Sequence, residues 1–354
     1  MLPGDPCQPC PYFFTQAPKE ITCKKKHLLL ALAATAVTAS AMAQSSVTLY
    51  GRVNTTVEYQ KTGDDKIYGL FNNSSRFGIK GVEDLGGGLK AGFQLESGFN
   101  SDTGMGAGAN GGMSFDRQSE INLSGGFGMV RLGNFFPESY FATADYVSLH
   151  NHDTGSSSDA LYYDPVWFGK LGTGNKVAYR TPDFGGFTAE AAMSFHEKPS
   201  GQNGKHGYDL AANYAVGPLA LGAGYSYVDG DYQLGLRGLY TMGQFTAGAY
   251  YQRNKQADHN GVTGWGTRNN FRISGMYALG ASEFHINVGN ANKWSNLPDS
   301  GATQWTLGYN YNLSKRTKVY GYYTAINNKA GANYGVGKLG DDFSSLAVGV
   351  RHNF

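Results

Sequence analysis

The sequence has no long apolar run and very little cysteine. A membrane-spanning helix needs at least about eighteen consecutive apolar residues, and no such stretch occurs, so spanning helices are excluded. The three cysteines, Cys7, Cys10 and Cys23, all lie near the N-terminus. Cys7 and Cys10 have the spacing of a zinc site, but no second pair or nearby histidine completes one. We therefore expect no metal and no other cofactor.

The chain also lacks an excess of charge of either sign. It has 29 lysines and arginines against 27 aspartates and glutamates. Four of those lysines and two of those acids lie in residues 1–43, which leaves 25 of each in the remaining 311 residues. Because a nucleic-acid partner would require a basic surface, the neutral total argues against one.

The N-terminal region has the features of an export signal. Lys24, Lys25 and Lys26 precede an apolar run at 28–37, and Ala-Met-Ala at 41–43 is a cleavage site of small residues. We expect residues 24–43 to be a signal peptide that is cut before Gln44, and residues 44–354 to form a single domain. Residues 1–23 have no place in such a signal, and we interpret them as an extension from a start codon assigned too far upstream.

The C-terminal nine residues alternate strictly in character. One face has Leu346, Val348, Val350, His352 and Phe354, and the other has Ala347, Gly349, Arg351 and Asn353. An exposed terminal strand of this kind invites aggregation in a soluble protein. In a membrane barrel the same strand is paired on both sides, with its apolar face toward lipid and its polar face toward the lumen.

The same alternation recurs along the whole mature chain. Short turns such as Gly217-Pro218 and Met242-Gly243 separate the segments on one side, and long polar stretches such as 98–113 and 254–266 separate them on the other. The chain is also rich in the residues that barrels use for bends and interfacial girdles, with 51 Gly, 24 Tyr and 20 Phe. The sequence predicts an all-β fold, a transmembrane antiparallel β-barrel of about sixteen strands.

Several motifs make the prediction more specific. They are residues 45–51 (SSVTLYG), 81–91 (GVEDLGGGLKA), 184–187 (FGGF), 312–317 (NLSKRT) and 348–354 (VGVRHNF). In this order they resemble the Gram-negative general porins of beta-proteobacteria. The resemblance implies a homotrimeric, water-filled channel in the outer membrane for ions and small hydrophilic solutes. It also implies that the third outer loop folds inward to form a constriction.

The function of a pore depends on the charges that face each other across its constriction. The longest interruption of the alternation, residues 135–175, fits the inward loop and contains the acids Glu138, Asp145 and Asp153. Strand phase directs Arg52, Arg76, Lys80, Arg131 and Arg180 to the lumen. We hypothesise that loop carboxylates and wall cations together charge the constriction and create a transverse field across it.

Two positions depart from a simple pattern. Strict phase from Ile121 and Leu123 would turn Arg117 toward lipid, whereas the resemblance favours a role in the basic wall. The family tends to have arginine after the Leu-Gly of the fifth strand, where this chain has Asn134. One wall charge that the resemblance implies is therefore missing, which argues against a strong anion preference and leaves the sign of the selectivity open.

Other functions are compatible with parts of the sequence. Aromatic residues could stack sugars in a substrate-selective channel, although most lie on the lipid phase or at strand ends. His352 could belong to a barrel enzyme of the phospholipase type, but no outward serine with an orienting partner is evident. His150 and His152 could bind a metal, but further ligands are missing. We predict a channel and not an enzyme.

The resemblance also implies partners. It implies self-association, contact with outer-membrane lipids and lipopolysaccharide, and recognition of the C-terminus by the barrel assembly machinery. Phe354, a terminal aromatic residue after an alternating strand, is the expected assembly signal.

Overall fold

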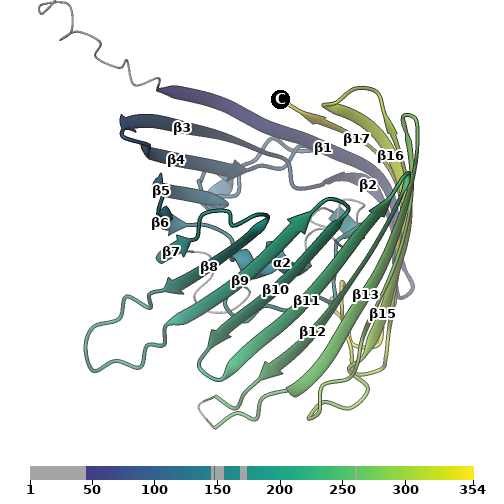
Figure 1. Ribbon diagram of the computed structural model, residues 1–354. Helices are drawn as coiled ribbons and strands as arrows, with labels where there is room; N and C mark the ends of the chain where they lie inside the picture. The colour runs from purple at the N-terminus through teal and green to yellow at the C-terminus, as the bar shows by residue number, and fades with distance from the viewer. Residues whose placement is uncertain (1–44, 145–146, 148–154, 168–173, 260) are drawn as a thin grey trace, which may run out of the picture. The chain divides into compact units, whose positions relative to one another are not determined.

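The computed structural model describes residues 45–144, 147, 155–167, 174–259 and 261–354. In these residues, seventeen strands form one antiparallel sheet (Figure 1). The strands are β1 (Ser46–Thr62), β2 (Asp65–Asn72), β3 (Arg76–Gly86), β4 (Leu89–Gly98), β5 (Gln118–Gly125), β6 (Gly128–Asn134), β7 (Lys176–Arg180), β8 (Phe187–Ser194), β9 (Gly207–Val216), β10 (Leu219–Val228), β11 (Asp231–Met242), β12 (Phe245–Gln256), β13 (Gly266–Leu279), β14 (Ser282–Ala291), β15 (Ala302–Asn312), β16 (Thr317–Asn328) and β17 (Phe343–Asn353). Helical turns are α2 (Glu138–Thr143), η1 (Ala109–Gly111) and η2 (Gly155–Ser157).

The first strand closes the sheet into a barrel. One edge of β1 pairs with β17, and its other edge pairs with both β2 and β3. Because β2 and β3 pair with successive halves of β1, they are two pieces of one barrel strand. The barrel therefore has sixteen strand positions, which confirms the predicted number.

The break between β2 and β3 has a local cause. Ser74 has a φ of 57°, a left-handed conformation that cannot continue a strand. Asn54 of β1 binds both sides of the break, because its backbone N–H donates to Ser75 Oγ and its side-chain amide donates to the Asn73 carbonyl. Residues on both sides of the break thus form hydrogen bonds with the neighbouring strand β1.

Strand β2 is a correction to the sequence prediction. In the sequence, clear alternation ends at Tyr59 and resumes at Phe77, and the polar residues between them predict a loop, but Asp65–Asn72 is a strand that follows a two-residue turn at 63–64. Its outward side chains include Tyr68 and Leu70, which pair with Tyr59 and Val57 of β1, and the rings of Tyr59 and Tyr68 have centroids 4.7 Å apart. The end of the hairpin near the turn is exposed to water and has charged residues on both faces. These residues interrupt the alternation of apolar and polar side chains in the sequence.

The predicted division of strand faces is confirmed. In β17, Leu346, Val348 and Val350 are exposed on the outer surface, whereas Ala347 is 1% exposed on the inner face. In β1, Val53 and Val57 are exposed, and Asn54 and Glu58 are buried. A closed sheet satisfies its backbone polar groups internally, so an apolar exterior is compatible with lipid.

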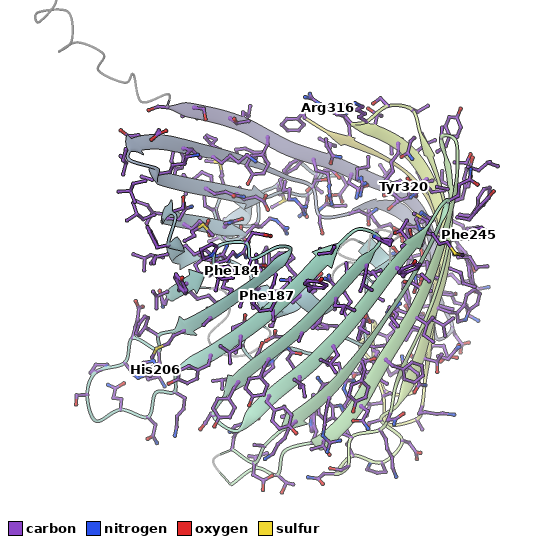
Figure 2. The ribbon with its side chains drawn as sticks, viewed as in Figure 1. Phe184, Phe187, His206, Phe245, Arg316 and Tyr320 are labelled. Atoms are coloured by element: carbon purple, nitrogen blue, oxygen red, sulfur yellow. The ribbon has the colours of Figure 1, made fainter. Side chains whose placement is uncertain are left out.

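Connections differ in length between the two ends of the barrel. One end has the short turns 87–88, 126–127, 217–218, 243–244, 280–281 and 313–316, and the other has long loops such as 99–117, 135–175, 257–265 and 329–342. The segregation is not complete, since 63–64 and 229–230 are short turns at the long-loop end. Figure 2 shows Arg316 at the short-turn end and His206 at the other, with Phe184, Phe187 and Phe245 on the outside near the short turns.

The longest loop folds into the barrel, as predicted. It connects β6 to β7 and contains α2, which contacts β9, β10 and β11. Outward residues such as Leu221 alternate with the inward Gly222 and Gly224, so α2 approaches the wall from the lumen side. A Cβ at Gly222 would collide with the carbonyl oxygen of Ala142, which means that only glycine permits this close approach.

The buried apolar residues gather where this loop meets the wall. One cluster joins Tyr140, Val147 and Tyr162 of the loop to Tyr250 of β12. A second joins Leu161 to Ile326 of β16 and Phe343 of β17. Three of the four buried apolar clusters in the described residues therefore lie between the inward loop and the barrel wall.

Candidate functional site

The lumen contains a cavity of about 1100 Å³ between the strands and the inward loop. Among the described residues that line it, six are cationic, namely Arg52, Arg76, Arg117, Arg237, Lys318 and Arg351. One, Glu96, is a carboxylate. The loop contributes aromatic side chains, namely Phe136, Tyr140, Phe141 and Trp167. The described lining is therefore strongly positive on the wall and aromatic on the loop.

Glu96 of β4 organises two of these cations. Its Oε1 accepts a hydrogen bond from Arg117 Nε at 2.7 Å and lies 3.7 Å from Arg76 Nε. Tyr50 donates to Oε2 at 3.0 Å, so the carboxylate is held on both oxygens. Since Glu96 is largely buried, one fixed negative charge positions two positive ones at the edge of the cavity.

The sequence left open whether Arg117 points toward lipid or toward the lumen. The structure resolves this, because Arg117 lies just before β5 and not within it. Because β5 starts at Gln118, the alternation of that strand does not fix the direction of the Arg117 side chain. The guanidinium reaches Glu96 and lies over the Phe136 ring at 5.3 Å. Arg117 thus faces the lumen.

Arg131 and Arg180 form a second ion-pair group, outside the described lining of the cavity. Arg131 Nη2 lies 3.3 Å from Glu190 Oε1, and Arg180 Nε donates to Glu190 Oε2 at 2.8 Å. Arg180 and Glu190 are direct partners in the β7–β8 register. Arg131 also lies 3.7 Å from Glu120. Wall carboxylates therefore neutralise much of this basic group.

The remaining two predicted wall cations differ in position. Arg52 lines the cavity and donates to Asn353 Oδ1 at 3.3 Å, its partner in the register that closes the barrel. Lys80 is exposed near the short-turn end, with its amino group 5.3 Å from the centre of the Tyr50 ring.

The described loop acids contact the wall. Glu138 forms an ion pair with Arg180, and burial raises the pKa of this carboxyl while Arg180 opposes the shift. Asp159 forms an ion pair with Arg272 of β13 in which both side chains are fully buried. Asp145 and Asp153 lie outside the described residues.

A third loop acid, Asp164, is part of a polar latch, which we define as Ser139, Asp164, Asp209 and Ser226. Ser226 Oγ of β10 is 3.0 Å from Asp164 and 2.8 Å from Asp209 of β9, and Ser139 bonds to Asp209. Backbone N–H groups of Val166 and Trp167 donate to Asp164 at 2.9 and 3.1 Å. Burial raises the pKa of Asp164. The latch and the close packing of α2 hold the loop against β9 and β10.

Sequence reasoning did not select several functional side chains. Arg237, Lys318 and Arg351 line the cavity, and each lies on the inner phase of its strand, so alternation alone could have identified them. Arg272 and the wall acids Glu120 and Glu190 have the same inward phase. Their pairing depends on strand register and loop position, for which the sequence has no local signal.

Phe354 lies at the closure of the barrel. Its backbone exchanges two hydrogen bonds with Gly51, at 3.0 and 3.1 Å. A Cβ at Gly51 would collide with the Phe354 ring, so the ring packs directly on this glycine. The terminal residue therefore extends the β1–β17 pairing.

The histidines considered for a metal site or a barrel enzyme can also be placed. Within the described residues, no group of three His, Cys, Asp or Glu side chains could hold a metal, and His150 and His152 lie outside those residues. His352 Nδ1 is 2.8 Å from Thr317 Oγ1. None of the helices in the described ranges is long and apolar enough to cross a membrane.

Comparison with known proteins gives consistent matches. The family described as Gram-negative porin matches residues 29–331. Outer membrane porin protein 32 of Delftia acidovorans is 34% identical, with 93% of this chain and 100% of the relative covered. An outer membrane porin protein of Bordetella pertussis is 28% identical, with 93% of this chain and 100% of the relative covered.

A solved structure agrees in fold as well as sequence. The anion-selective porin from Comamonas acidovorans has a TM-score of 0.75 and 30% identity, with 88% of this chain and 100% of that chain covered. These relatives are channels and not enzymes. With sixteen strand positions, an apolar exterior and an inward loop, the chain belongs to the Gram-negative porin family and forms a channel in the outer membrane.

Proposed function

We propose that this porin is a general diffusion channel for small hydrophilic solutes that favours anions. The observation that carries the proposal is the lining of the lumen cavity, where the described residues include six cations and a single carboxylate. Such a lining raises the local concentration of anions and lowers that of cations. The similarity to the anion-selective porin from Comamonas acidovorans supports the same sign.

We assign different roles to the predicted charged residues. Arg52, Arg76 and Arg117 attract anions directly, because they line the cavity. Arg180 and Glu138 position the loop through their ion pair, and Arg131 pairs with Glu190, the wall carboxylate that also binds Arg180. Lys80 contributes to the field near the short-turn end, and Asp145 and Asp153 stay predicted pore acids.

Liposome swelling tests the proposed channel. In this assay, entry of a solute through the channel swells the vesicle. We expect fast entry of a small uncharged sugar and of small organic anions, and slower entry of an organic cation of similar size. Equal rates for anion and cation would contradict the preference, and no entry of any solute would contradict diffusion.

We further propose the export and assembly steps that the sequence predicts. The mature chain starts at Gln44 after removal of residues 24–43, Phe354 is recognised during barrel assembly, and three copies associate in lipid that includes lipopolysaccharide. Mass spectrometry of protein taken from outer membranes tests the cleavage.

Current steps that open in groups of three in planar bilayers would support the trimer, and isolated single steps would contradict it.

A further inference from the structure

The lumen cavity has two chemically different sides. The wall supplies cations, and the inward loop supplies aromatic rings rather than carboxylates. Trp167 packs edge-on against Phe136 and Tyr140, with ring centroids 5.2 and 4.6 Å apart. Tyr140 is buried in the loop core, but Phe136, Phe141 and Trp167 are only partly buried and keep surface toward the cavity.

The loop acids do not interrupt this aromatic side where they are described. Glu138 bonds to Arg180, Asp159 to Arg272, and Asp164 to Ser226, all on the barrel wall. None of these three carboxylates is among the described residues that line the cavity. An entering solute therefore meets apolar, polarisable surface on this side.

The cations and the rings meet at two points. Arg117 lies with its guanidinium carbon 5.3 Å from the centre of the Phe136 ring. Arg237 Nη1 donates at 3.0 Å to the carbonyl of Phe141, so this guanidinium is fixed beside the loop. A small molecule that contacts the rings can therefore contact a guanidinium group at the same time.

We propose that the cavity is a binding site for small aromatic carboxylates, with the ring against Phe141 and Trp167 and the carboxylate toward the arginines. The proposal rests on the proposed anion preference and adds the ligand class. Aromatic pairs gain affinity beyond the area that they bury, by about two- to tenfold. A guanidinium pairs well with a planar carboxylate, whatever group the carboxylate is attached to. The aromatic part of the ligand is therefore what the loop selects.

Block of the channel current tests the proposal. Benzoate and cyclohexanecarboxylate have the same charge at neutral pH and similar size, but only benzoate has an aromatic face. Each is added to the reconstituted full channel in potassium chloride, and the concentration for half block is measured. We expect benzoate to block at a concentration about two- to tenfold lower. Equal block by the two acids would overturn the proposal without any variant.

Matched variants locate the effect. Replacing both rings, Phe141→Leu with Trp167→Leu, should make the two acids equally potent while the channel still conducts. The control Trp305→Leu removes an indole from the outer face of β15 and should keep the wild-type ratio. If the double variant fails to assemble, Phe141→Leu alone should lower the ratio. A wild-type ratio in an assembled ring variant would contradict the site.

The reversal potential in potassium chloride separates this inference from the proposed function. A channel that prefers chloride but does not distinguish the two acids would overturn the aromatic site alone. A channel without chloride preference would overturn the proposed function, whatever the block by benzoate.

Discussion

At the scale of single residues, the balance of charge at the lumen depends on Glu96. It is the one carboxylate among the described residues of the cavity lining, and it contacts both Arg76 and Arg117. Glu96→Gln removes that negative charge and should raise the anion-to-cation permeability ratio by roughly twofold, a modest change because salt screens the field. Bilayer reversal potentials measure the ratio. Glu83→Gln, in an exposed position near a short turn, is the control, and a lower ratio in Glu96→Gln would contradict this role.

Asp164 leads to a prediction about pH. Burial raises the pKa of its carboxyl in the folded protein, with Lys176 opposing the shift, so the folded state keeps a proton that the unfolded state has lost. Stability from this group is therefore present at acidic pH and decreases as the pH rises from the unfolded pKa toward the raised one, by up to about 1.4 kcal/mol per pH unit. Asp164→Asn stays uncharged, and its amide can also bond to Ser226.

Thermal unfolding in detergent between pH 4 and pH 8 measures this effect. The unfolding temperature of Asp164→Asn relative to wild type should increase with pH. A difference that is constant across the range would show that the carboxyl does not titrate between the two states as expected.

At the scale of elements, the position of the inward loop depends on small wall residues. Gly222 and Gly224 of β10 leave room for α2, and the close approach at Gly222 excludes a methyl group. Gly222→Ala should displace the loop or strain the wall at a cost of about 1–3 kcal/mol, and should change the single-channel conductance. Gly238→Ala is the matched control, because its Cβ would meet Leu221 at an ordinary 3.7 Å. Wild-type conductance and stability in Gly222→Ala would contradict the close packing of α2 against β10 at this position.

The strands could be predicted well from alternation, because one face of each strand contacts lipid and the other contacts polar groups. Alternation failed for β2, where charged residues at the exposed end outweighed the apolar ones. For Arg52 and Arg76, in contrast, alternation correctly predicted side chains that point into the lumen. It could not predict that Glu190 pairs with Arg180 or that Asp159 pairs with Arg272, since these contacts depend on register and on the path of the loop.

At the scale of the whole molecule, closure depends on the last residue. Phe354 extends the β1–β17 pairing through Gly51, so its loss leaves the seam shorter. Deletion of Phe354 should lower the yield of assembled barrel strongly and change the conductance of each assembled channel little. Phe354→Tyr keeps the ring and should assemble normally. Normal yield of the deleted chain in outer membranes would contradict the proposed assembly role.

The central claim is a wet channel whose cationic wall selects anions, and the reversal potential in a potassium chloride gradient tests it most directly. We predict a potential of the sign set by chloride, a clear shift toward zero in Arg76→Gln with Arg117→Gln, and no shift in Arg253→Gln, which removes one positive charge from the outer face of β12. A potential set by potassium in the wild-type channel, or an unchanged potential in the double variant, would contradict it.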